Sequence, residues 1–311
     1  PRPAPVNLAP LMAVERAQAN GIEIAYEAFG EASDPPLVLI MGIGSQMINW
    51  PEGFCEELVG RGLYVVRFDN RDAGESTHLD EAGKVDVSAV LNGDTSSAPY
   101  TLSDMADDVA GLLDALKIDG AHIVGASMGG MIAQTFALEH GDRTRSLISI
   151  MSTTGDPELP GATEEAQAVL LQPSAQSREE LIERSVASYR VLGSPGFEID
   201  EDYLRERAGR SWDRGYDPPG FGRQLAAIYA SGNRTERLRS LRVPTLVIHG
   251  EDDPLIRLTS GQATAAAIEG AELLTIPGMG HDLPRGAWPQ IVDAMAALVE
   301  RVERERVPAA G

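Results

Sequence analysis

The stretch Ile123-Val124-Gly125-Ala126-Ser127-Met128-Gly129-Gly130-Met131 places a serine between glycines where an apolar run gives way to a helical pattern. The residues before Ser127 are typical of a buried strand, and apolar residues recur at helical spacing after it. A serine at the tip of such a tight turn requires nearly side-chain-free residues two positions before and after it. Gly125 and Gly129 meet this requirement, so we expect Ser127 to be a nucleophile on a strained turn.

Two backbone N–H groups are expected beside this serine. Met128 follows Ser127 at the start of a predicted helix, where an amide points toward negative charge that forms nearby. A second glycine-rich turn, Met41-Gly42-Ile43-Gly44, follows another apolar run. Because its glycines let the backbone approach a ligand closely, the Ile43 N–H is the expected second donor of an oxyanion hole.

Serine is a poor nucleophile at neutral pH and needs a neighbouring base that is oriented by a third group. Among the five histidines, His281 lies in the turn Pro277-Gly278-Met279-Gly280-His281, directly after a predicted strand. This position puts its imidazole at the same sheet edge as Ser127, so we expect His281 to be the general base. Of the other four, His122 is expected in a core strand and His140 at a helix end. His78 is expected in a polar loop, and His249 is expected to pack at a strand end.

The carboxylate that orients His281 is also expected after a strand. The segment Gly250-Glu251-Asp252-Asp253-Pro254 follows one and offers three acids. We select Asp253 because a proline fixes the turn immediately after it. Asp252 and, more remotely, Asp156 are the alternatives.

The remaining pattern predicts an α/β protein. An Asn-Gly pair at residues 20–21 joins two alternating segments and predicts an antiparallel hairpin that opens the sheet. Continuous apolar runs, as in residues 37–40, indicate strands buried on both faces of a mostly parallel sheet flanked by helices. We expect the charge-dense loop 69–76 to fix neighbouring loops through arginine–carboxylate pairs.

One long segment lacks strand patterns. Its helical stretches, separated by glycine and proline, are 164–171, 178–191, 202–209 and 223–229. We therefore expect an inserted helical cap, or lid, over the carboxyl ends of the strands, where such sheets bind ligands. The predicted division is a loose tail at 1–12, a core at 13–155 and 236–311, and a cap at 156–235.

Composition restricts the partners. The 311 residues include 47 acidic and 26 basic ones and carry a net charge of −21, which argues against nucleic acid and anionic lipid as partners. The sequence contains neither an apolar run of about 18 residues, as a membrane span requires, nor a metalloprotease motif. The lone Cys55 is expected to be buried. We expect a cytoplasmic protein without metal or cofactor.

These motifs resemble those of the α/β-hydrolase superfamily. The resemblance rests on the turn at 41–44, the elbow at 125–129, the acid loop at 250–254, His281, and the chain order serine, aspartate, histidine. Within the superfamily, residues 49–51, 67–76 and 277–281 resemble the aclacinomycin methylesterase subfamily. Met41 stands where the superfamily commonly has a histidine.

The resemblance implies an α/β-hydrolase fold and a triad of Ser127, Asp253 and His281, with oxyanion donors from Ile43 and Met128. It also implies a helical cap over a cleft for a bulky ester. The expected reaction is hydrolysis of a hydrophobic small-molecule carboxylic ester through an acyl-enzyme, a methyl ester of a bulky acid being one candidate. Carbon–carbon bond hydrolysis and cofactor-free perhydrolysis use a similar triad. A binding protein that has lost its chemistry is disfavoured by the intact triad.

Overall fold

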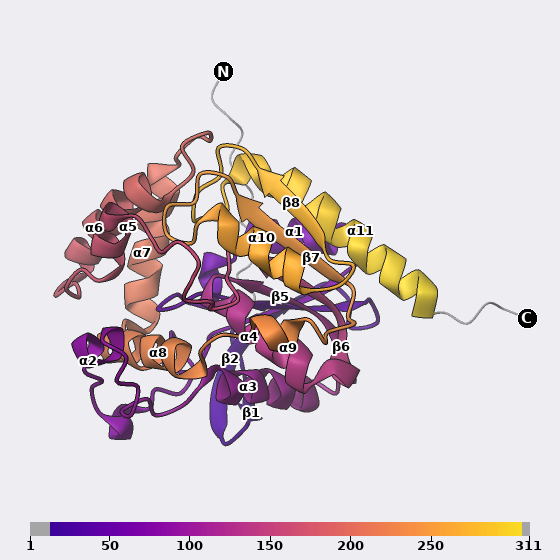
Figure 1. Ribbon diagram of the computed structural model, residues 1–311, viewed down its shortest axis with the longest axis horizontal. Helices are drawn as coiled ribbons and strands as arrows, with labels where there is room; N and C mark the ends of the chain where they lie inside the picture. Colours follow the sequence, from indigo (N-terminus) through magenta and orange to yellow (C-terminus); the bar gives the residue numbers. More distant parts are fainter. Residues whose placement is uncertain (1–12, 307–311) are drawn as a thin grey trace, which may run out of the picture.

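An eight-stranded sheet organises residues 13–306, the part of the chain that this computed structural model describes (Figure 1). The strands are β1 (Glu15–Ala19), β2 (Ile22–Phe29), β3 (Pro36–Ile40), β4 (Tyr64–Phe68), β5 (Ala121–Ala126), β6 (Thr144–Ile150), β7 (Thr245–Gly250) and β8 (Glu272–Ile276). Their order in the sheet is β1-β2-β4-β3-β5-β6-β7-β8. β2 pairs antiparallel with β1 and β4, and the later pairs are parallel. The tail predicted at 1–12 lies outside the described residues.

The predicted hairpin is confirmed. Ala19 of β1 lies opposite Ile22 of β2, which leaves a two-residue loop between the strands. The φ angles of Asn20 and Gly21 are 48° and 79°, and two positive values are what a type I′ turn requires. Local sequence was therefore sufficient to place the first edge of the sheet.

Helices cover both faces of the sheet. They are α1 (Glu52–Val59), α2 (Val87–Leu91), α3 (Leu102–Ala115), α4 (Met128–Glu139), α5 (Glu164–Leu170), α6 (Arg178–Leu192), α7 (Glu201–Gly215), α8 (Pro218–Ser231), α9 (Thr235–Leu238), α10 (Leu258–Ala267) and α11 (Trp288–Arg306). In β3, Val38 and Ile40 join the apolar core that α3 and α4 complete, whereas Leu37 and Leu39 join the core that α1 and α11 complete. An apolar run without alternation thus marks a strand that is buried on both faces.

Helices α5 to α9 lie between β6 and β7 along the chain. In Figure 1, α5, α6 and α7 lie together at one side of the molecule, and α8 lies beside α2. The C-terminal α11 packs against α1. Within residues 13–306, none of the helices is both long and apolar enough to cross a membrane.

Helix α7 is longer than the apolar pattern predicts, since it continues beyond residue 209 to Gly215. Its last turns are rich in charged residues, and ion pairs hold them beside the stacked rings of Trp212 and Tyr216. Arg210 contacts Glu52 at 2.7 Å, and Arg214 contacts Asp69 at 2.5 Å. A prediction from apolar periodicity therefore ends the helix too early when ion pairs stabilise its last turns.

Helix α8 begins at Pro218, five residues before the predicted start at 223. Proline and glycine in this stretch were interpreted as breaks, but proline is favourable in the first turn of a helix. Gly220 is needed because a Cβ there would lie 2.3 Å from the carbonyl oxygen of Asp72. Both residues therefore belong to a closely packed helix start.

Candidate active site

Ser127 lies in the turn between β5 and α4, with φ 57° and ψ −121°. A non-glycine residue in this region costs about 1–3 kcal/mol and persists only when its surroundings enforce it. A Cβ at Gly125 would lie 1.9 Å from the carbonyl oxygen of Gly129, and one at Gly129 would lie 2.1 Å from that of Ile40. The predicted need for residues without side chains on both sides of the serine is therefore confirmed.

This packing predicts a large loss of stability for Gly129→Ala. The new methyl group would overlap the β3 backbone, which cannot move away as a side chain could, so we expect a destabilisation of about 3 kcal/mol or more. Gly141→Ala is the matched control, because a Cβ there has no neighbour within 4 Å and should change stability by less than about 0.5 kcal/mol. Urea unfolding of both variants measures the difference, and equal midpoints would contradict this account.

The structure brings three of the predicted site residues into one hydrogen-bonded chain. His281 Nε2 lies 3.1 Å from Ser127 Oγ, and His281 Nδ1 lies 2.7 Å from Asp253 Oδ2. The other carboxylate oxygen of Asp253 accepts the N–H groups of Leu255 and Ile256, each at 2.9 Å. A buried carboxylate fixed in this way accepts a hydrogen bond from Nδ1–H, which leaves Nε2 unprotonated and able to take the serine proton.

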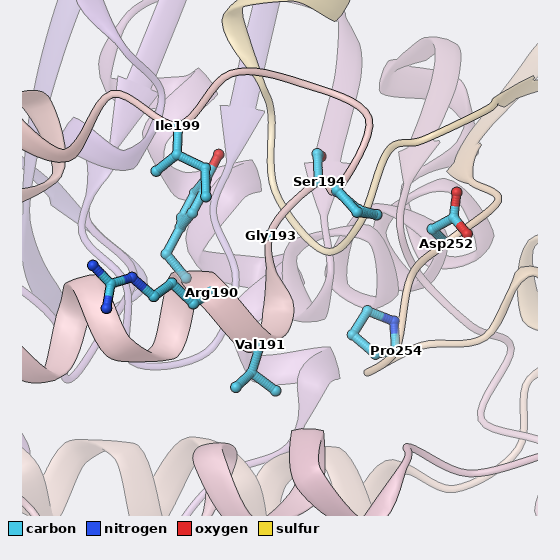
Figure 2. Close-up of a pocket in the computed structure, with 9 residues that line it drawn as sticks. Arg190, Val191, Gly193, Ser194, Ile199, Asp252 and Pro254 are labelled. Carbon is cyan, nitrogen blue, oxygen red and sulfur yellow. The ribbon is translucent and has the colours of Figure 1, made fainter.

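The two alternative acids lie elsewhere. Asp252 accepts the Gly278 N–H at 2.9 Å and lines a cavity of about 150 Å³ beside the end of α6 (Figure 2). Asp156 accepts the N–H of Glu158 at 3.1 Å. Asp253 is thus the acid that the structure pairs with His281.

Two backbone donors flank the serine. Met128 is the first residue of α4, so its N–H has no acceptor within the helix. The turn that contains Ile43 passes directly beside Ser127, since a Cβ at Gly42 would lie 3.1 Å from Ser127 Cβ. Among residues 13–306, no protein acceptor pairs with the Ile43 N–H. Both donors are available for a ligand.

A protein-family model described as the alpha/beta hydrolase fold matches residues 35–284, which is most of the chain. The chain belongs to the α/β-hydrolase fold family. The fold class and the family resemblance inferred from the motifs are both confirmed.

Relatives of this α/β-hydrolase include enzymes of two reaction classes. Rhodomycin D methylesterase of Streptomyces peucetius is 30% identical over 294 residues, covering 87% of this chain and 93% of the relative. A 2-hydroxy-6-oxononadienedioate/2-hydroxy-6-oxononatrienedioate hydrolase of Paraburkholderia xenovorans is 32% identical over 265 residues, covering 84% of each chain. A solved thermophilic esterase of Thermogutta terrifontis matches with a TM-score of 0.69 and 25% identity, covering 93% of this chain and 99% of the esterase.

The inserted helices of this α/β-hydrolase also hold the turn that carries His281. The His281 N–H donates to the carbonyl of Leu192 at 2.7 Å, and the Gly280 N–H donates to Ser194 Oγ at 2.9 Å. The carboxylate of Asp282 accepts the hydroxyls of Ser194 and Tyr189. Sequence reasoning missed these contacts, because nothing local in the break after α6 indicates which loop it packs against.

Two of the remaining histidines are buried, as predicted. His122 contacts Ser146 Oγ at 2.7 Å, and burial lowers its pKa to about 4. His249 contacts the carbonyl of Ile256 at 2.7 Å. Cys55 is also buried, and burial raises the pKa of its thiol to about 12. These groups belong to the interior rather than to the reaction centre.

The predicted ion pairs of loop 69–76 are confirmed. The pairs are Asp69 with Arg214 at 2.5 Å, Arg71 with Asp108 at 2.6 Å and Asp72 with Arg223 at 2.7 Å. Two of the three tie the loop to α7 and α8. Carboxylate and imidazole atoms of Asp72, His78 and Asp217 also converge here. Both carboxylates already contact the Arg223 guanidinium, so we do not assign a metal to this cluster.

His78 makes the stability of this region dependent on pH. Burial lowers its pKa, but hydrogen bonds to the Asp217 carboxylate and the Gly74 carbonyl, each at 2.8 Å, outweigh burial and raise the pKa above 6.5. A raised folded-state pKa contributes stability that is complete below pH 6.5 and is lost as pH rises through the folded value. We therefore expect the unfolding free-energy difference between the natural protein and His78→Gln to shrink as pH rises above 6.5. Urea unfolding across this range measures it, and a constant difference would contradict the assignment.

Proposed function

We propose that this α/β-hydrolase is a serine carboxylesterase in which Ser127 is the nucleophile, His281 the general base and Asp253 the residue that orients the base. The observation that carries the proposal is the hydrogen-bonded chain from Asp253 through His281 to Ser127, at 2.7 and 3.1 Å, on a strained turn. The fold family and the methylesterase relatives support a hydrolase that acts on esters.

The reaction proceeds through an acyl-enzyme. His281 takes the hydroxyl proton as Ser127 Oγ attacks the ester carbonyl carbon, and the N–H groups of Ile43 and Met128 stabilise the negative charge on the carbonyl oxygen. The tetrahedral intermediate collapses, and the alcohol leaves with the proton from His281. Water activated by the same imidazole then hydrolyses the acyl-enzyme, which yields the acid and restores the serine. The mechanism requires no cofactor.

The proposed substrate is a hydrophobic small-molecule ester, specifically a methyl ester of a bulky acid. Rhodomycin D methylesterases of two Streptomyces strains match this chain over most of their lengths, which supports the methyl-ester assignment. We also propose that residues 156–235 form a cap over the core at 13–155 and 236–311. A cap in this position would set the shape of the cleft and exclude water.

A p-nitrophenyl ester series from acetate to palmitate, together with methyl esters of polycyclic acids, tests the proposal. We expect turnover, with intact-mass detection of an acyl adduct on Ser127. The second candidate is carbon–carbon bond hydrolysis, which the 32% identical Paraburkholderia relative favours. A dienoic ring-cleavage product assayed beside the esters separates the two reactions: turnover of that compound without ester hydrolysis would replace the esterase proposal.

A further inference from the structure

The turn that carries the Ile43 N–H contains few groups that fix the orientation of this amide. Ile43 lies between Gly42 and Gly44, and the φ of Gly44 is +63°. Glycines on both sides leave the backbone dihedrals around this amide weakly restricted. A hydrogen bond from the Ser45 N–H to the Gly42 carbonyl, at 3.3 Å, closes the turn. Its orientation relative to the nucleophile therefore depends on contacts from outside.

Two buried side chains provide those contacts, one on each side of Ile43. Before it, Asn70 Nδ2 donates to the carbonyl of Met41 at 2.9 Å. After it, the Gly44 N–H donates to Gln224 Oε1 at 2.7 Å. Asn70 belongs to the loop after β4, whereas Gln224 belongs to α8, 180 residues further along the chain than its partner.

Gln224 is itself held at both ends. Its side chain is fully buried, and its Nε2 donates to the carbonyl of Arg71 at 2.7 Å. Rotation of this amide would leave buried polar groups unpaired, which is unfavourable. The Phe221 ring, also on α8, covers the turn so closely that a Cβ at Gly44 would lie 2.9 Å from it. Helix α8 thus both covers the turn and holds it by a hydrogen bond.

We infer that Gln224 is a positioning residue for the oxyanion turn and that α8 thereby controls the rate of the chemical step. The inference rests on the proposed function, in which the Ile43 N–H stabilises the oxyanion. A donor that points away from the oxyanion loses an interaction that is strongest in the transition state. Loss of Gln224 should therefore lower kcat more than it raises KM.

Gln224→Met tests this, because methionine fills a similar volume and removes both hydrogen bonds. We expect kcat for a p-nitrophenyl ester to fall about 10- to 100-fold, with KM changed by less than about threefold. A trifluoromethyl ketone, whose adduct with Ser127 places an oxyanion at the same position, should lose affinity by a similar factor.

Ser231→Ala is the matched control. It removes another hydrogen bond between α8 and the core, the one that Ser231 Oγ accepts from the Leu102 N–H at 2.8 Å. This variant should keep both kcat and the affinity for the ketone. If Gln224→Met matched it in both, or raised KM while kcat stayed unchanged, the inference would be overturned.

A crystal structure of Gln224→Met separates this inference from the proposed function. We expect the Ile43–Gly44 peptide to be displaced in the variant, whereas an unchanged turn would overturn the inference. If the natural protein hydrolysed no ester, the proposed function would fail, and the structure of the variant would still decide whether Gln224 positions the turn.

Discussion

Replacing Ser127 with alanine is expected to reduce ester turnover by about 10⁵- to 10⁶-fold, because no other group in the site can form the acyl-enzyme. The remaining rate would come from substrate binding and the backbone donors. Alanine has backbone preferences similar to those of serine, so the strained turn should persist and the melting temperature should change little. Initial rates with a p-nitrophenyl ester and a thermal melt measure both effects.

A fluorophosphonate probe provides an independent test of the same residue. The natural protein should gain one adduct, located on Ser127 by peptide mass spectrometry, and Ser127→Ala should gain none. Turnover within about tenfold of the natural rate in a folded alanine variant would remove Ser127 from the mechanism.

The neighbouring acids Asp252 and Asp253 should behave very differently when each is replaced by asparagine. In Asp253→Asn, the amide would present an N–H₂ group to His281 Nδ1, so the imidazole would carry its proton on Nε2 and could no longer accept the serine proton. This loss of the correct tautomer is expected to lower kcat by about 10⁴-fold. Kinetics with the same ester measure it.

Asp252→Asn is the matched control, because asparagine keeps an oxygen that can accept the Gly278 N–H. It lies beside the cavity at the end of α6 rather than against the imidazole, and its activity should stay within about threefold of the natural value. Equal losses in the two variants would mean that the loop conformation, and not the carboxylate of Asp253, matters for the reaction.

Features that depend on neighbouring residues were predictable from the sequence. The hairpin follows from an Asn-Gly pair that accepts positive φ angles, and the turn at Ser127 follows from glycines at the positions where a Cβ would meet backbone. Strand ends at one edge of a parallel sheet also bring distant loops together, which is why His281 and Asp253 could be proposed as partners. The family of the chain was evident from these features.

The distant partners of most side chains were not predictable. The end of α7 is held by Arg210 and Arg214 against acids more than a hundred residues away, and polar residues at a helix end are usually solvated. Nothing in the sequence around Gln224 indicates that the fold places this helical residue against Gly44. A single sequence does not identify the partner in such contacts, because each depends on the position of a second segment.

The hydrogen bonds that join the end of α6 to the histidine turn limit how this enzyme can diverge. The Leu192 carbonyl and the Ser194 hydroxyl contact the turn on either side of the imidazole, so the inserted helices are not an exchangeable module. A chimera that received these helices from a relative would lose the contacts that hold His281, unless both contacts were grafted with them. Adaptation to new substrates is therefore expected through single substitutions on α5 to α8, in a framework that keeps residues 192–194.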